Sequence, residues 1–228
     1  NEAKLLLFAY CPEYDIIFET KGGDMMISYA EQIENKINDY ARGKVFIAND
    51  FLDIASYETV RKTLNRLTNN DKIKRILKGF YYNPSYNELI REYEAPSMHE
   101  LAIAIARKYN WDIAPYSTTA LNFLGISTQV PSKLTYISSG RNKEYQIGNN
   151  VIAFKKTRPA EIANMSFITA TVIQAIRTLG KDKITEKTIQ TISHYLSQKE
   201  KRDLMNEATS VAAWIYEVIR KICEDKNE

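Results

Sequence analysis

The stretch SYETVRKTLNRLTNNDKIKRILKGFYYNP, residues 56–84, decides the fold expected for the first half of the chain. Residues 56–70 predict a helix, because Ser56 is a favourable N-cap and apolar residues follow at helical spacing. The buried stripe of this helix would be formed by Val60, Leu64 and Leu67. Residues 71–84 then alternate like two strands joined by a tight turn at Gly79.

The elements predicted before this stretch complete an order of helices and strands that is typical of one known fold. Residues 28–43 predict a capped helix, residues 44–47 a short strand, and residues 48–55 a short helix. Helix, strand, helix, helix and hairpin within residues 28–84 are the order of a winged helix-turn-helix. Such a domain places its third helix in the major groove of DNA, while its hairpin reaches the neighbouring backbone.

The cations of this region lie where such a domain meets DNA. Residues 61–78 hold seven Lys or Arg against one acid, Asp71. Arginine reads guanine edges and asparagine reads adenine, while lysine and threonine contact phosphates. The expected DNA-binding residues are Ser56, Tyr57, Thr59, Arg61, Lys62, Asn65, Arg66, Lys72, Lys74, Arg75, Lys78 and Gly79. The residues expected to read bases or to position the helix in the major groove are Arg61, Lys62, Asn65 and Arg66. The residues expected to hold the flanking DNA backbone are Lys74, Arg75 and Lys78.

A second interpretation of the same region stays open. Winged helices also serve as protein-interaction modules without DNA, and solvated lysines blunt an exposed strand edge. Tyr81 and Tyr82 are expected to pack rather than to stack on bases, because successive strand residues point to opposite faces and one of the two therefore points inward.

The rest of the chain predicts an α+β protein in which the winged helix precedes a larger domain. Residues 85–97 are acidic around a proline and predict a linker, and residues 98–228 predict the second domain. This domain would contain a small antiparallel sheet, since turn residues separate three short β-rich runs. Its strands are expected at residues 133–138, 144–148 and 151–156, and a helical bundle is expected to follow from Pro159.

A second basic patch falls on the predicted sheet. It consists of Lys133, Arg141, Lys143, Lys155, Lys156 and Arg158, against the single acid Glu144. The patch would extend the DNA footprint, contact RNA or meet an acidic partner, or it would be ordinary solvated surface.

No catalytic site is expected, and neither is a metal or another cofactor. The two histidines, His99 and His194, fit capping or half-buried positions, and Cys11 and Cys223 form no metal or redox motif. A nucleic-acid-processing enzyme that uses the basic sheet remains an alternative, but it would need acids brought in from distant helices. Few cysteines and no long apolar run favour a cytoplasmic protein without a membrane span.

Residues 1–27 differ in character from the rest of the chain and are expected to be an N-terminal extension. The sequence KGGD at residues 21–24 can be encoded by a ribosome-binding sequence placed before Met25 or Met26. One hypothesis is therefore that residues 1–24 are translated leader; the other is a strand or helix that packs on the domain.

From residue 28 to the end, the chain resembles the AbiEi-like antitoxins of bacterial type IV toxin–antitoxin, phage-defence (abortive infection) systems. The resemblance rests on the leucine and isoleucine pattern of the third helix, on the R-x-x-K-G-x-Y hairpin (Arg75, Lys78, Gly79, Tyr81), and on YSTTALNFLG at residues 116–125. It implies a winged helix that binds double-stranded DNA at its own promoter and represses it. It also implies that the C-terminal domain counteracts a nucleotidyltransferase-like toxin from the same operon, without a stable complex.

Overall fold

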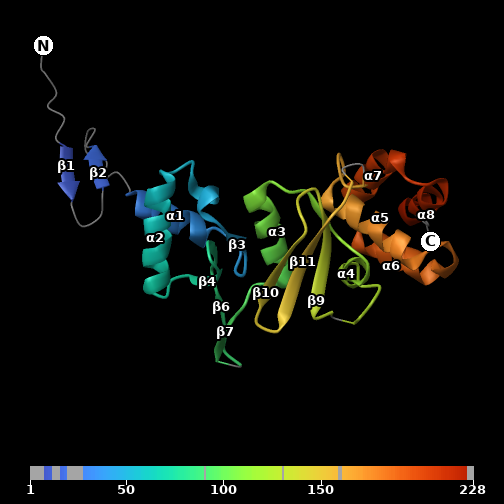
Figure 1. Cartoon of the computed structure of the whole chain (residues 1–228), viewed down its shortest axis with the longest axis horizontal. Helices are drawn as coiled ribbons and strands as arrows, with labels where there is room; N and C mark the ends of the chain where they lie inside the picture. Colours follow the sequence, from blue (N-terminus) through green and yellow to red (C-terminus); the bar gives the residue numbers. More distant parts are fainter. Residues whose placement is uncertain are drawn as a thin grey trace, which may run out of the picture. The chain divides into compact units, whose positions relative to one another are not determined.

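The computed structural model divides the chain into two compact units, residues 1–108 and 109–228 (Figure 1). It describes residues 28–89, 91–129, 131–158 and 161–224, together with the backbone of strands β1 (Phe8–Cys11) and β2 (Ile16–Glu19). These two strands pair antiparallel. Apart from their backbone, the hypothesis of a leader at residues 1–24 falls outside the described residues.

The helices of the first unit begin at the serines that the sequence singles out. Helix α1 (Tyr29–Asn38) is capped by Ser28, whose hydroxyl accepts from the Glu31 N–H at 3.2 Å. Strand β3 (Val45–Phe46) and the 3₁₀ helix η1 (Ala48–Phe51) follow. Helix α2 (Tyr57–Asn69) is capped by Ser56, which accepts from the Thr59 N–H at 3.4 Å. Each cap satisfies a backbone donor that the first turn leaves unpaired.

A three-stranded antiparallel sheet with the order β3-β5-β4 completes this region. Strands β4 (Lys74–Leu77) and β5 (Phe80–Tyr82) are joined by the turn that the sequence predicts at Lys78 and Gly79. Gly79 has φ +79°, a conformation that side chains with a Cβ rarely adopt, so the turn requires glycine at this position.

The core of the first unit forms between α1, α2 and this sheet. Its members include Ile33, Ile37, Phe46, Phe51, Val60, Leu64, Leu67, Ile73 and Tyr81. The rings of Phe46 and Phe51 meet edge to face with centroids 5.6 Å apart. Burying one such side chain contributes about 1.5–3 kcal/mol, so the stripe on α2 holds the helix in a single rotation about its axis.

The acidic segment predicted as a linker contains a second hairpin. Strands β6 (Ser85–Asn87) and β7 (Glu92–Glu94) pair antiparallel, with the rings of Tyr86 and Tyr93 facing each other at 5.2 Å. A cross-strand aromatic pair supplies apolar contact that the surrounding acids do not.

Helix α3 (Met98–Tyr109) is assigned by the sequence to the second domain, but almost all of it lies in the first compact unit. Arg107 explains this position, because its guanidinium donates to both carboxylate oxygens of Asp50 at 3.0 and 2.8 Å. The same side chain donates to the Val45 carbonyl at 3.0 Å. These partners are far apart in sequence, so no local pattern indicates the contact.

The second unit contains a four-stranded sheet with the order β10-β11-β9-β8. Its strands are β8 (Ile113–Pro115), β9 (Lys133–Ser138), β10 (Lys143–Ile147) and β11 (Asn150–Lys156). The pair β10/β11 is antiparallel, as expected, and so is the pair β8/β9, whose strand β8 was not predicted from the sequence. Strand β11, however, pairs with β9 in parallel. The sheet is therefore mixed, and this corrects the prediction of a purely antiparallel one.

The parallel pair has a physical cause. Strand β11 buries Ile152, Ala153 and Phe154, so it takes a central place, while the more polar β10 lies at the edge. The chain between β9 and β10 must then pass across the end of β11. Gly140 lies in this loop, and a Cβ there would come within 2.1 Å of the Trp111 ring, so only glycine fits.

Helices make up the remainder of the second unit, as the sequence predicts for the segment after Pro159. They are α4 (Thr118–Phe123), α5 (Phe167–Leu179), α6 (Glu186–Tyr195), α7 (Gln198–Glu207) and α8 (Ala213–Cys223), with 3₁₀ turns η3 (Lys181–Lys183) and η4 (Ala208–Ser210). One apolar core joins α4 to these helices, with Val172, Ile192, Leu204 and Ile219 among its members.

A carboxylate from α7 helps to hold this bundle together. Glu207 accepts from the Ser166 N–H at 2.8 Å, at the start of α5. Burial alone would raise the pKa of Glu207, but hydrogen bonds from Thr169 and Ser166 hold it below its ordinary value. The contact therefore favours the ionised carboxylate beside a helix N-terminus.

The described residues include no helix that is both long enough and apolar enough to cross a bilayer. The chain is a mixed α+β protein with small sheets, as the sequence predicts.

Leu64→Ala is expected to lower the free energy of unfolding of the first unit by about 2–5 kcal/mol, because it empties a fully buried site. The matched control is Leu52→Ala, since Leu52 is 48% exposed at the end of η1, and its loss should change stability by less than about 0.5 kcal/mol. Urea unfolding followed by circular dichroism measures both. Equal effects of the two substitutions would contradict the position of the core.

Candidate nucleic-acid interface

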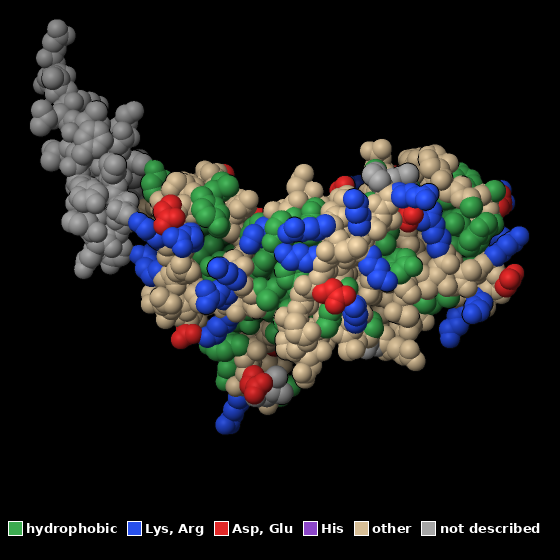
Figure 2. Space-filling view, in the orientation of Figure 1, with side chains coloured by type: hydrophobic (Ala, Val, Ile, Leu, Met, Phe, Trp, Pro, Cys, Tyr) green, Lys and Arg blue, Asp and Glu red, His purple; other side chains and the backbone are tan. Residues whose placement is uncertain are grey.

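The predicted DNA-binding residues of α2 lie on the side of the helix away from its buried stripe. Tyr57, Arg61 and Lys62 are exposed, while Thr59, Asn65 and Arg66 are half-buried. Lys and Arg side chains gather over α2 and the β4–β5 hairpin in the space-filling view (Figure 2). The helix thus presents cations and amides outward, as the sequence predicts.

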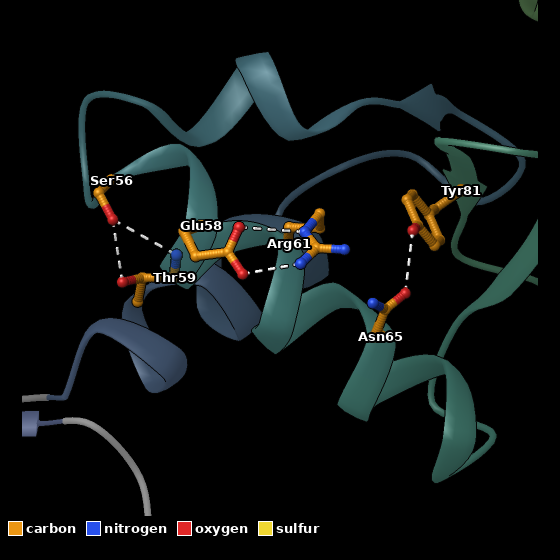
Figure 3. Close-up of polar contacts among 6 residues, drawn as sticks. All are labelled: Ser56, Glu58, Thr59, Arg61, Asn65 and Tyr81. Carbon is orange, nitrogen blue, oxygen red and sulfur yellow. Dashed lines mark hydrogen bonds and ion pairs between the residues drawn. The ribbon is translucent and has the colours of Figure 1, made fainter.

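Arg61 is held by an acid one turn earlier on the same helix. Its Nε and Nη2 donate to the two carboxylate oxygens of Glu58 at 3.2 and 2.7 Å (Figure 3). The hydrogen bond from Arg61 lowers the pKa of Glu58, and the carboxylate raises the pKa of Arg61 in return. The sequence prediction omitted Glu58, although its spacing of three residues from Arg61 is a signal for such a pair.

Asn65 is connected to the sheet. The Tyr81 hydroxyl donates to Asn65 Oδ1 at 3.3 Å, so β5 and α2 meet through this hydrogen bond (Figure 3). The ring of Tyr81 stacks on Phe46 with centroids 6.4 Å apart, and both Tyr81 and Tyr82 are buried. The expectation that these tyrosines pack inside the domain is confirmed. The oxygen of Asn65 is therefore directed at Tyr81, and this bears on the expected recognition of adenine.

Two of the predicted DNA-binding lysines have acidic neighbours. Lys72 forms an ion pair with Glu34 of α1, and Lys74 forms one with Asp71. The hydrogen bond to Asp71 raises the pKa of Lys74. Solvent screens exposed pairs of this kind, so they contribute little to folding. Exchanging the carboxylate partner for a DNA phosphate would therefore cost little stability.

The β4–β5 hairpin carries two further cations, Arg75 on strand β4 and Lys78 at the turn. Arg75 and Lys78 are exposed, and within the described ranges neither forms a hydrogen bond or an ion pair. A Cβ added at Gly79 would lie 3.0 Å from Lys108 Nζ. Lys108 comes from the end of α3 and lies over the Phe80 ring at 4.6 Å, so a further cation reaches this turn that no local sequence pattern indicated.

The structure separates the second basic patch. Alternation along paired strands places Lys133 and Lys155 on one face of the sheet and Lys143 and Lys156 on the other. Arg141 lies in the loop after β9, and Arg158 lies beyond the end of β11. The six cations therefore do not form one surface.

The contacts of these lysines are local. Lys133 forms an ion pair with Glu144, the only acid of the patch. Lys143 lies over the rings of Tyr109 and Tyr145 at 5.3 and 4.9 Å, and Lys155 over Tyr116 at 5.3 Å. These cation–π contacts are local to each lysine and do not join the lysines into one extended nucleic-acid surface.

No metal-ligating cluster of His, Cys, Asp or Glu is present in the described part of the chain. A groove of about 500 Å³ in the first unit is lined by charged side chains of both signs, which include Arg42, Lys44, Glu94 and Glu100. His99, at the start of α3, is half-buried, as the sequence suggested, and burial lowers its pKa to about 4. Its imidazole is therefore neutral near pH 7.

These features define a two-unit α+β protein with an outward-facing cationic helix and hairpin in its first unit. The chain belongs to a family of unknown function (DUF6088), whose model matches residues 32–204. A crystal structure of the RV2827C protein from Mycobacterium tuberculosis is similar with a TM-score of 0.36 and 11% sequence identity, covering 86% of this chain and 76% of that one. No curated protein matches the chain.

The free energy of unfolding is expected to fall as the pH drops from about 6.5 towards 4. The unfolded chain binds a proton at His99 near its ordinary pKa of 6.5, whereas the folded protein does so only at about 4. His99→Gln should reduce this loss of stability at low pH. His194→Gln, at an exposed position of α6, should leave the loss of stability unchanged. Urea midpoints at several pH values measure the effect. If His99→Gln loses as much stability between pH 6.5 and 4 as the unmodified protein, His99 is not the group responsible.

Proposed function

We propose that the first unit is a winged helix-turn-helix that binds double-stranded DNA. The order α1, β3, η1, α2 and the β4–β5 hairpin, with its sheet order β3-β5-β4, supports this proposal. Helix α2 would lie in the major groove, and the hairpin would follow the neighbouring phosphate backbone.

The observation that carries the proposal is the pair of exposed cations on the β4–β5 hairpin, Arg75 on its first strand and Lys78 at its turn. Arg75 and Lys78 lie directly after a helix whose own outer face carries Arg61 and Lys62. Phosphate contacts position a protein on DNA, and base contacts from the helix specify the sequence. The two sets of side chains come from elements joined by one short connection, so they can meet one duplex together.

The resemblance to the AbiEi-like antitoxins extends the proposal to the role of the whole chain. On this proposal the protein represses the promoter of its own operon. Its second unit counteracts a nucleotidyltransferase-like toxin from that operon, and no stable complex with the toxin is required. No residue of the second unit is assigned to this activity.

Lys78→Ala is expected to weaken binding to every duplex alike and to reduce the slope of log K against log salt by about one, because one phosphate contact is lost. Lys221→Ala, at an exposed position of α8, is the matched control and should change neither quantity. Fluorescence anisotropy with the upstream DNA of the gene, at several salt concentrations, measures both. Absence of binding even at low salt would favour the alternative of a protein-interaction module.

Growth arrest by the product of the neighbouring reading frame is expected to be relieved when the full chain is co-expressed. Lys78→Ala should keep this relief while losing repression of a promoter–reporter fusion, because the two activities would belong to different units. Colony counts and reporter output measure the two activities separately. Unrelieved arrest with intact repression would remove the antitoxin role and leave the DNA-binding role in place.

A further inference from the structure

Two hydrogen-bonded pairs fix the polar groups that α2 presents outward: Glu58 with Arg61, and Tyr81 with Asn65. Resting on the DNA-binding function proposed above, we infer that α2 reads a guanine through Arg61 with Glu58 as its positioning residue. We infer further that Asn65 donates to an acceptor of a neighbouring base and does not make the two-point contact that selects adenine. The substrate class is duplex DNA with a guanine in the major groove contacted by α2.

The Arg61 guanidinium has two edges that can donate a parallel pair of hydrogen bonds. Glu58 occupies the edge formed by Nε and Nη2. The remaining edge, formed by Nη1 and the second hydrogen of Nη2, points away from the carboxylate. Two parallel donors at this spacing match N7 and O6 of guanine, which no other base presents together in the major groove.

The charge of the pair favours a base over a phosphate as its target. Glu58 neutralises the formal charge of Arg61, and both side chains are about half exposed, at 57% and 51%. A phosphate near this pair would meet the carboxylate as well as the guanidinium, so the net attraction would be small. The neutral guanine edge is free of this repulsion. A guanidinium already held in one orientation also loses less side-chain entropy when it binds.

The contact with Tyr81 changes what Asn65 can recognise. Recognition of adenine uses Oδ1 as an acceptor and Nδ2 as a donor at once. Oδ1 accepts from the Tyr81 hydroxyl at 3.3 Å and is therefore directed at β5, so the group left for a base is the Nδ2 amide with its two donors. Such donors suit N7 or O6 of guanine, N7 of adenine or O4 of thymine, so they do not select adenine over these other bases.

The two reading groups also have a suitable spacing. Arg61 and Asn65 are four residues apart on α2 and share one side of the helix. Their Cα positions are roughly 6 Å apart along the axis, from a rise of about 1.5 Å per residue. This separation spans about one to two base-pair steps of roughly 3.4 Å. The expected signature is a guanine with an acceptor-rich base pair beside it.

Selection from a library of randomised duplexes, followed by sequencing, tests the inference on the full chain. The unmodified protein should enrich guanine at one position. Glu58→Gln should still bind the library but lose roughly tenfold of this guanine preference, because the guanidinium is no longer held by a charged partner. Tyr81→Phe removes the hydroxyl that holds Oδ1, so it should raise the share of adenine at the neighbouring position.

Arg75→Ala is the matched control, since it should weaken all sequences alike and leave the preferences unchanged. Circular dichroism confirms that each variant is folded. If the unmodified chain binds the library without a guanine position, or if Glu58→Gln keeps the full preference, the inference is wrong and DNA binding stands. If no duplex is retained even at low salt, the DNA-binding proposal fails, and the inference fails with it.

Discussion

The burial of one side of α2 fixes the orientation of the whole candidate interface. Val60, Leu64 and Leu67 contact the core formed with α1 and the small sheet, so the helix cannot rotate without exposing them. Arg61 and Asn65 must then lie on the outer side, because they fall between the buried positions of a 3.6-residue repeat. Tyr81 connects the two sides, since its ring belongs to the core and its hydroxyl reaches Asn65. Hydrophobic packing therefore determines which hydrogen-bonding groups face outward.

The local parts of this structure could be predicted from the sequence, because their causes are local. Ser56 and Ser28 cap the helices that begin after them, and glycine allows the turn at Gly79. The strand order of the second sheet could not be predicted, because pairing joins residues that are distant in sequence and depends on which strand is most apolar. The separation of the second basic patch could have been foreseen: Lys155 and Lys156 are adjacent in β11, and adjacent strand residues point to opposite faces.

Counting charges along the sequence overstates the positive surface of the first unit. Arg61, Lys72 and Lys74 each form an ion pair with a carboxylate. A count of charges along the sequence does not reveal these pairs. These pairs are exposed, so solvent screens them and each contributes little to folding. Their main physical effect is on orientation, since a guanidinium or ammonium group with a partner samples fewer directions.

The passage of the chain over the end of β11 constrains how the protein emerges from a ribosome. Strands β9 and β10 are made before β11, yet they flank it and cannot complete their pairing until residues 150–156 have been synthesised. Strand β9 keeps an open edge until then, and open edges recruit other chains. A nascent chain from which β9 has emerged, while residues 150–156 are still inside the ribosome, would therefore be prone to aggregation.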